Sequence, residues 1–328
     1  MELSSDLPNV KKVAILGLRR AGKSTFLAVL SRALDDIDSP WTIAPKDEDA
    51  IKNMNYYRDM LFNKRLYPPN TPESGPTRVL RFTVYRERGR LGIRSGGMYE
   101  LEVADVPGGA MRGIFGPAEH QKFYEEYVEG RAGIIFLLDP QQKWKEGEPL
   151  SGDSYADPYY PLFSSIVEQI RLQFAPYEPV IQNVYVAFCV TKLDTIYDQP
   201  KHRKADKMFA DEGICEATEK HAEDILGPKT KRYIDRYFKN VRWMPVSATG
   251  YTKDREVQFE ERYEDGTNKA GIRDPVNLSP IGVAEAVEWI LDQIAEDNAR
   301  AWNGTNRLRG AARPDGVIRS LLRRIGLE

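Results

Sequence analysis

The amino-acid sequence predicts an α/β fold in which a mostly parallel sheet is covered by helices on both faces. Short apolar segments alternate, along 328 residues, with segments whose apolar positions recur at helical spacing. A glycine-rich segment, residues 17–24, joins the first apolar segment to the first helical one. Polar motifs also follow several later strands directly, which is where open α/β sheets bind ligands.

The expected strands are short runs of apolar residues. They cover residues 12–16, 78–86, 98–104, 133–138, 183–190 and 241–246. No helical segment separates the second strand from the third, so these two are expected to form a hairpin. The prediction is therefore a six-stranded, mostly parallel sheet with one antiparallel edge strand.

The expected helices carry an apolar stripe at helical spacing. They cover residues 23–34, 117–129, 160–174, a polar helix ending at 233–238, and 280–294. Pro117 suits the start of a helix, Gly130 suits a stop, and Ser279 is expected to cap the last helix.

Four stretches rich in charge, proline, glycine or tyrosine do not fit a minimal domain. We interpret them as loops or insertions over the core, and they cover residues 36–76, 140–160, 195–215 and 250–279. One domain is expected over residues 1–298, followed by a basic tail over residues 299–328.

Composition narrows the class of protein. The formal net charge of −2 gives no overall nucleic-acid footprint. Cys189 and Cys215 cannot form a disulfide framework, and they fit inert thiols in a reducing compartment. The first residues lack the regions of a signal peptide, and no apolar run is long enough to span a bilayer. A cytoplasmic location is expected, with His120, His202 and His221 on the surface rather than on a metal.

Residues 17–24 read GLRRAGKS, which matches the GxxxxGK[ST] phosphate-binding loop. Gly17 and Gly22 let the backbone curl so that its N–H groups point inward, toward a polyphosphate. Lys23 is expected to reach the β- and γ-phosphates, and the hydroxyl of Ser24 to bind Mg²⁺. The expected nucleotide contacts of this loop are Gly17, Arg19, Arg20, Ala21, Gly22, Lys23, Ser24 and Thr25.

A DxxG motif, Asp105 to Gly108, follows the strand 98–104. In this position Asp105 would lie near Mg²⁺, usually through water, and the Gly108 N–H would meet the γ-phosphate. The motif alone is also compatible with a plain turn at a strand end.

Two further motifs are expected to bind a purine base. Thr191-Lys192-Leu193-Asp194 follows the strand 183–190 and fits [NT]KxD, and Ser247-Ala248 follows the strand 241–246. The carboxylate of Asp194 can accept hydrogen bonds from guanine N1–H and the 2-amino group, which adenine does not offer in that arrangement. The stem of Lys192 can lie on the purine face, and the Ala248 N–H can meet guanine O6.

With these four boxes in order, residues 10–296 resemble the TRAFAC-type GTPases. The resemblance implies a Ras-like P-loop three-layer domain over residues 1–298. It also implies GTP and GDP binding, dependence on Mg²⁺, and slow hydrolysis that toggles two switch loops.

The fifth family box is a single threonine in the first switch. Thr71, within YPPNT, is the favoured candidate, because this stretch resembles the WPxxT of bacterial GTPases related to double-GTPase and conflict-system families. It would join Ser24 and Asp105 at Mg²⁺, and with Arg20 and Lys23 it completes the candidate catalytic set. Thr77 is the alternative, and a turn role remains open for both.

Two departures from the family pattern bear on hydrolysis. Gly109 stands where Ras-like members carry the glutamine that orients the attacking water. Arg20 stands where guanylate-binding and atlastin-like GTPases carry an arginine that can act as a finger in cis. Arg112 is an alternative donor, and Arg19 or Arg20 could instead bind an acidic surface.

The basic tail contains an amphipathic stretch, residues 317–325. A short helix that docks on this chain or on a partner is the favoured interpretation, and contact with an anionic membrane is the alternative.

The function that these features favour is a GTP-hydrolysing switch that acts on an effector protein. A GTP-locked scaffold is the alternative, which Gly109 favours, and a P-loop ATPase is a third reading, which Asp194 opposes. A nucleotide-dependent homodimer is left open, and no nucleic-acid partner is expected.

Overall fold

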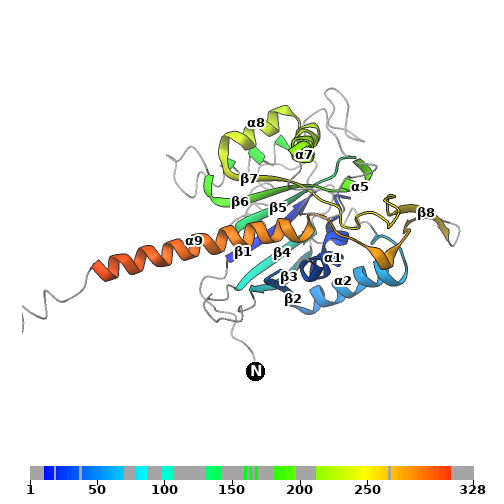
Figure 1. Ribbon diagram of the computed structural model, residues 1–328, viewed down its shortest axis with the longest axis horizontal. Helices are drawn as coiled ribbons and strands as arrows, with labels where there is room; N and C mark the ends of the chain where they lie inside the picture. The colour runs from blue at the N-terminus through cyan, green and yellow to red at the C-terminus, as the bar shows by residue number, and fades with distance from the viewer. Residues whose placement is uncertain are drawn as a thin grey trace, which may run out of the picture.

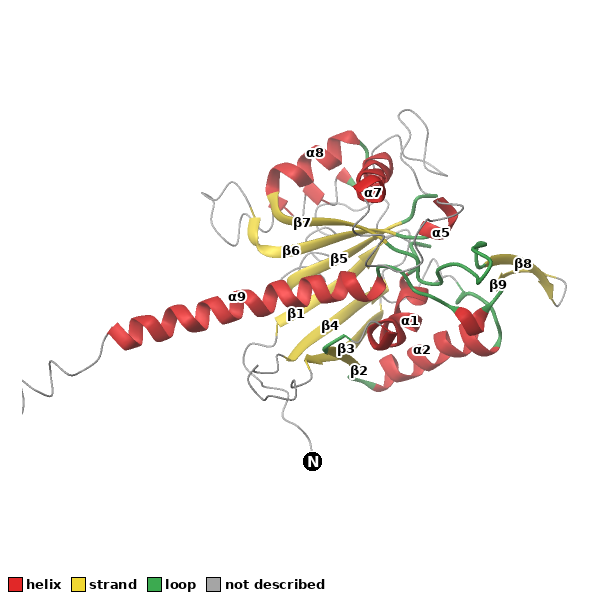
Figure 2. Cartoon of the chain, viewed as in Figure 1, coloured by secondary structure: helices red, strands yellow, loops and turns green. Residues whose placement is uncertain are grey.

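The computed structural model describes residues 11–17, 20–36, 39–69, 78–86, 98–105, 131–141, 159–160, 163–164, 167–168, 181–196, 212–264 and 267–311. Its centre is a twisted sheet with helices packed on both faces (Figure 1). A separate hairpin stands beside one end of the sheet (Figure 2).

The central sheet has seven strands in the order β2-β3-β4-β1-β5-β6-β7. Their bounds are β1 Lys11–Gly17, β2 Trp41–Pro45, β3 Arg78–Arg86, β4 Met98–Asp105, β5 Arg131–Leu138, β6 Ile181–Val190 and β7 Phe238–Pro245. Strands β4, β1, β5, β6 and β7 are parallel, whereas β3 is antiparallel to β4 and β2 is antiparallel to β3. The connection of β1 to the first helix through residues 17–24, with this strand order, confirms the predicted Ras-like P-loop fold class.

The prediction of six strands misses β2. This strand lies inside the stretch 36–76, which the sequence presents as a loop or insertion. Only Trp41 and Ile43 of its five residues are buried, so its alternation is too short to stand out from a charged surrounding. The added strand places β3 second from the edge, with β2 outside it.

The predicted helices that are described in full differ from the structure at their ends, but two described helices, over residues 48–58 and 212–226, were not predicted. They are α1 Lys23–Asp36, α2 Glu48–Arg58, the π-helix η1 Asp59–Asn63, α5 Leu193–Ile196, α7 Glu212–Leu226, α8 Pro228–Tyr237, the 3₁₀-helix η2 Pro275–Asn277 and α9 Val283–Ala311. The last helix starts at Val283, so Ser279 does not cap it; the N–H of Ser279 instead donates to the Thr249 carbonyl at 3.2 Å. It also continues through Ala311, into the predicted tail.

The stretch 250–279, also expected as a loop or insertion, contains the antiparallel hairpin of β8 Phe259–Glu264 and β9 Thr267–Ile272. The predicted helix 117–129, the tail stretch 317–325 and the insertion 140–160 except for its ends lie outside the described residues. Of the stretch 195–215, residues 197–211 lie outside them, and its last four residues begin α7. For the predicted helix 160–174 the structure describes only short pieces.

Two hydrophobic layers hold the sheet between the helices. Side chains alternate along β1, so Val13 and Ile15 face one layer and Ala14 and Leu16 face the other. The first layer packs α1, α2 and α9 on the sheet, and the second packs α7 and α8. Burial on both faces explains why the central strands read as continuous apolar runs.

Candidate nucleotide-binding site

The motif segments meet at one edge of the sheet because they follow parallel strands in register. Gly17, at the end of β1, pairs with Leu137, and Leu138 pairs with Val190 of β6. Val190 in turn pairs with Pro245, at the end of β7. The glycine-rich loop, residues 191–194 and residues 247–248 therefore leave the sheet side by side, as the sequence predicts.

The backbone of the glycine-rich loop takes conformations that few residues adopt. Gly22 has a φ of 91° and Arg20 a φ of 68°, both in the left-handed region. Gly17 is required for a different reason, since a Cβ there would lie 2.9 Å from the Leu137 carbonyl oxygen. The amide of Phe26 donates to the Gly22 carbonyl at 2.8 Å and closes the first turn of α1.

The side chain of Lys23 folds back onto the start of this loop. Its side chain is buried, and its Nζ donates to the Gly17 carbonyl oxygen at 2.7 Å. A buried ammonium at the N-terminus of a helix makes a concentrated positive site. This arrangement suits an anion as large as a polyphosphate.

Lys192 is held in place by groups from the end of β5. Its backbone has a left-handed φ of 53°, and its Nζ donates to Asp139 Oδ2 at 2.8 Å and to Gln141 Oε1 at 3.2 Å. Thr191 anchors the same turn, since its N–H and its hydroxyl both donate to the Leu138 carbonyl, at 2.8 and 2.9 Å. Asp139 was not predicted as a site residue, although its position directly after a strand is the signal that identified the other motifs.

Asp194 is a buried carboxylate, with 4% of its surface exposed. Ser247 Oγ donates to Asp194 Oδ1 at 2.6 Å, and the Gly250 N–H donates to Ser247 Oγ at 2.9 Å. Burial raises the pKa of Asp194, and the hydrogen bond from Ser247 partly offsets that shift. The predicted pair of Asp194 and Ser247 is therefore a connected unit, with the serine orienting the carboxylate.

Backbone pairing fixes the loop that carries Ser247. The Ser247 N–H donates to the Ile281 carbonyl at 2.9 Å, and the Ile281 N–H donates to the Ser247 carbonyl at 2.8 Å. Gly250 has a φ of 66°, and a Cβ there would lie 1.9 Å from the Ser279 carbonyl oxygen. Only glycine fits this turn without displacing the backbone that faces it.

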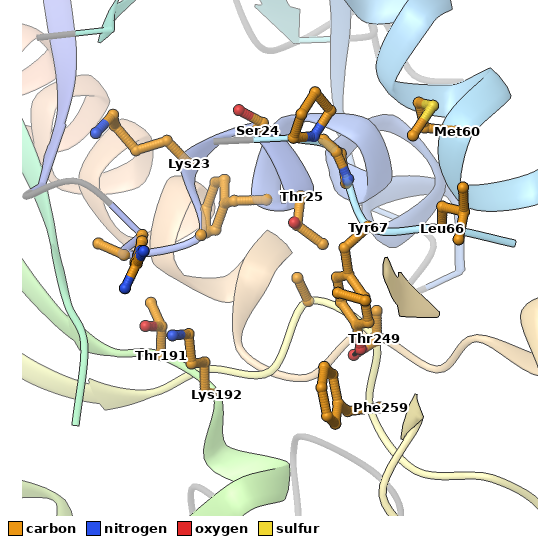
Figure 3. A pocket seen from close by; sticks show the side chains of 18 of the residues that line it. Lys23, Ser24, Thr25, Met60, Leu66, Tyr67, Thr191, Lys192, Thr249 and Phe259 are labelled. Carbon is orange, nitrogen blue, oxygen red and sulfur yellow. Dashed lines mark hydrogen bonds between the residues drawn. The ribbon is translucent and has the colours of Figure 1, made fainter. Parts of the chain in front are cut away.

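A single cavity of about 1040 Å³ joins these parts (Figure 3). The glycine-rich loop and the start of α1 line one end, and the turns after β6 and β7 line the other. Predicted site residues in its lining are Arg20, Ala21, Gly22, Lys23, Ser24, Thr25, Thr191, Lys192, Asp194 and Ala248. The volume lies at the upper end of the range for small-molecule and cofactor sites.

The rest of the lining comes from segments that the sequence analysis did not assign to the site. Tyr67, Pro68 and Pro69, a few residues after η1, line the cavity, and the Tyr67 hydroxyl lies 3.3 Å from Thr249 Oγ1. Burial and the nearby negative charge of Asp194 raise the pKa of Tyr67. Phe259 of β8 lies beside it, with ring centroids 6.2 Å apart. No local signal links these residues, which come together only in the fold.

Several predicted site residues lie outside the described part of the chain: Arg19, Thr71, Thr77, Gly108, Gly109 and Arg112. Asp105 ends β4, and the pairing of Ile15 with Val103 brings its backbone level with Gly17. Its side chain is not described. Within the described residues, no group of three or more His, Cys, Asp or Glu side chains could hold a metal by itself.

The sequence matches no family model and no curated protein. Several solved structures are similar to this chain. The SRb-GTP/SRX complex of the signal recognition particle receptor from Chaetomium thermophilum is 14% identical, with 75% of this chain and 94% of that chain covered and a TM-score of 0.33. Nucleolar GTP-binding protein 1 from Plasmodium falciparum is 13% identical, with 94% and 99% covered and a TM-score of 0.35. The Arl6 BBS3 small GTPase from Trypanosoma brucei, with bound GppNp, is 13% identical, with 88% and 99% covered and a TM-score of 0.30. At TM-scores this low, no functional conclusion follows from the likeness.

None of the described helices combines the length and the hydropathy that crossing a membrane requires.

Proposed function

We propose that this protein binds GTP and GDP in the cavity between the glycine-rich loop and the turns after β6 and β7. The observation that carries the proposal is the buried carboxylate of Asp194, oriented by Ser247, in the same cavity as Lys23. One end offers a positive cradle for phosphates, and the other an oriented acceptor for a base. A nucleoside polyphosphate requires both ends at once.

The chemistry of Asp194 favours guanine over adenine. Guanine presents two adjacent donors, N1–H and the 2-amino group, to a carboxylate, and satisfying them offsets the cost of the buried charge. Adenine has no hydrogen on N1 and no 2-amino group, so it would leave the buried carboxylate with Ser247 but without the two donors of the base. The stem of Lys192, tied to Asp139, forms the floor on which the purine would lie.

Mg²⁺ fits the phosphate end of this site. Magnesium in nucleotide sites is commonly held by one or two protein oxygens together with phosphate oxygens and water, so a cage of protein ligands is not needed. The hydroxyl of Ser24, which lines the cavity, would supply one ligand, with Asp105 and Thr71 as the further candidates. The ion would neutralise charge on the β- and γ-phosphates.

Competition for a fluorescent GDP, in the presence of Mg²⁺, tests the proposal. GTP and GDP should displace the probe, whereas ATP at the same concentration should not. Lys23→Ala is the matched blank, because it removes the ammonium from the loop and leaves the base end unchanged. Equal displacement by ATP and GTP would instead favour a P-loop ATPase.

We further propose that the bound GTP is hydrolysed, with Arg20 as a catalytic residue, and that the switch loops act on an effector protein. Arg20 lines the cavity and holds a left-handed φ of 68°, which costs a non-glycine residue about 1–2 kcal/mol. Because this conformation is costly for an arginine, its presence at residue 20 supports a role for the Arg20 side chain. A guanidinium near the β–γ bridge would neutralise charge that develops as the phosphoryl group leaves.

Turnover of GTP by Arg20→Gly, Arg20→Ala and Arg20→Lys variants tests this role. All three remove the guanidinium, but glycine relieves the backbone strain, alanine keeps it, and lysine retains a charge. We expect turnover to fall by about 10³-fold or more in all three while GTP affinity changes little. Normal turnover in Arg20→Gly would exclude Arg20 as the catalytic arginine.

Wild-type turnover measured over a range of protein concentrations separates the remaining alternatives. A rate per molecule that rises with concentration would support a self-activating GTPase with a nucleotide-dependent homodimer. GTP binding without turnover above the Lys23→Ala blank would favour the GTP-locked scaffold, as expected if Gly109 cannot orient water.

A further inference from the structure

One wall of the nucleotide cavity is built differently from the others. The glycine-rich loop and the turns after β6 and β7 continue directly from strands of the seven-stranded sheet. The opposite wall is the arm, residues 65–69, which leaves the end of η1 at Arg65, a residue with a left-handed φ of 59°. The Leu66 N–H donates to the Met60 carbonyl at 2.9 Å and fixes the start of the arm to η1.

The arm is joined to the β8–β9 hairpin along a short seam. Leu66 forms an isolated antiparallel bridge with Gly271 of β9. The Tyr67 N–H donates to the Ala270 carbonyl at 3.0 Å, and the Ile272 N–H donates to the Arg65 carbonyl at 2.8 Å. These two backbone bonds flank the bridge, so Leu66 and Gly271 form a non-hydrogen-bonded pair. The arm is thus a rudimentary third strand of the hairpin.

The same arm also reaches the base end of the cavity. The Tyr67 hydroxyl lies within 3.3 Å of Thr249 Oγ1, and Thr249 follows Ala248 in the turn after β7. In Figure 3 the ring of Tyr67 lies toward Thr249 and Phe259, across the opening from Lys192. A bound base would therefore have Lys192 on one side and the arm on the other.

The backbone pairing that closes this wall is short. One bridge and two backbone bonds are weak compared with strands paired over five or more residues. Beyond this pairing, the arm is held by the hydroxyl contact at 3.3 Å, the ring contact of Tyr67 with Phe259 and the burial of Leu66. Segments that open locally are drawn from parts of a structure with few contacts. The wall formed by the arm is the one that can open without breaking the central sheet.

We propose that the seam between the arm and β9 is the gate of the nucleotide cavity, and that the β8–β9 hairpin controls how fast nucleotide leaves. This inference rests on the proposed nucleotide binding and adds to it a site of regulation. With the seam paired, the arm encloses the base between Tyr67 and Lys192. With the seam separated, the arm can swing about Arg65 and release the nucleotide.

A reversible crosslink across the seam tests the gate. In a Leu66→Cys and Gly271→Cys double variant, the paired positions should lie about 4.5 Å apart between Cα atoms, which suits a disulfide. The protein is loaded with fluorescent GDP, oxidised with glutathione disulfide, and chased with unlabelled GDP. We expect release to slow at least about tenfold after oxidation, and dithiothreitol to restore it.

The reduced double variant is the reference, because a Cβ at Gly271 would lie 2.7 Å from Cδ of Arg262 and move that flexible side chain. A second crosslink, Glu264→Cys with Thr267→Cys, joins β8 to β9 at the far end of the hairpin without involving the arm. Release should be insensitive to oxidation there. Equal slowing by both crosslinks, or no slowing across the seam, would overturn the gate while leaving nucleotide binding intact.

Failure of the underlying binding would look different. If wild-type protein does not retain fluorescent GDP at all, the proposed function fails and the gate fails with it.

A milder pair of variants tests the gate without new cysteines. Tyr67→Phe removes only the hydroxyl contact to Thr249, and Tyr185→Phe removes a hydroxyl bond to Asp297 of α9, outside the cavity lining. We expect Tyr67→Phe to speed release by about threefold and Tyr185→Phe to leave it unchanged. Equal effects of the two variants would contradict a specific role of the arm.

Discussion

Asp194 combines two properties that oppose each other in the nucleotide-free protein. It is placed to accept hydrogen bonds from a base, yet it is a buried charge, and burial raises its pKa above the ordinary value. A residue of this kind favours ligand binding at the expense of stability. The conflict provides two measurable signatures.

The first signature is a stability gain on neutralisation. The folded-state pKa of Asp194 lies above its unfolded value of 3.8, so its contribution to stability declines as pH rises through that interval. Asp194→Asn should therefore raise the unfolding temperature of the nucleotide-free protein at neutral pH. The gain should vanish in acid, where the wild-type carboxyl is itself neutral. Thermal melts at both pH values measure this, and a lower melting temperature at neutral pH would contradict it.

The second signature is a change of base preference in the same variant. The asparagine amide offers an N–H₂ group where the carboxylate offered an acceptor, so it opposes the 2-amino group of guanine and matches the carbonyl of xanthine. We expect GTP affinity to fall at least about a hundredfold and xanthosine triphosphate to bind better than GTP. Titration of both nucleotides checks this. Unchanged GTP affinity would remove Asp194 from the base site.

Lys192 depends on a residue that the motif does not include. Asp139 is almost fully buried and accepts a 2.8 Å bond from Lys192 Nζ. Asp139→Ala should weaken GTP binding by about tenfold, because the lysine loses the group that orients it. Asp139→Asn keeps an acceptor and should lose less. Nucleotide titration of the two variants orders these effects, and equal losses would show that the charge matters more than the orientation.

At the scale of elements, the turn after β7 is held by a close approach of two backbone segments. Gly250 faces the Ser279 carbonyl at a distance that excludes a Cβ, whereas a Cβ at Gly22 would meet nothing within 4 Å. Both glycines have positive φ, at 66° and 91°. The two positions therefore separate backbone strain from steric clash.

Gly250→Ala and Gly22→Ala are matched substitutions for that comparison. Gly22→Ala should cost about 1 kcal/mol of unfolding free energy from its backbone conformation alone. Gly250→Ala should cost more, at least about 2 kcal/mol, because the Ser279 backbone must also move. Urea unfolding measures both. Equal costs would mean that the segment 277–281 yields easily, and that the turn is less rigid than its contacts indicate.

For the whole molecule, α9 packs across one face of the sheet, against β5 and β6, and reaches the edge strand β2. Ser39 donates to Glu288 at 2.6 Å, and the Trp41 indole donates to Asp292 at 3.2 Å, so α9 holds the edge strand β2. Among the residues of α9 up to Arg300 whose burial is described, Ile294 is the last buried one, and in Figure 1 the helix runs on beyond the sheet. The packed part of α9 belongs to the core, and the remainder projects from it.

Truncation after Asn298 tests this division. The shortened protein should unfold within a few degrees of the full chain and bind GTP normally, because every buried residue of α9 described is retained. Truncation after Ala286 removes Val287, Ile290 and Leu291 from the core and should prevent stable folding. Circular dichroism melts and GDP binding measure both. If the projecting part docks on an effector, the first truncation loses that partner alone.

The sequence by itself determined the fold class and the order of the binding motifs along the chain. Apolar runs are visible because the central strands are buried on both faces, and the motifs are visible because phosphate and base chemistry require particular residues at fixed spacing. Tertiary structure alone decided the edge strand β2, the partnership of Lys192 with Asp139, and the cavity wall with Tyr67 and Phe259. Those features join residues far apart in the chain through backbone pairing and packing, which leave no periodic or local signal in the sequence.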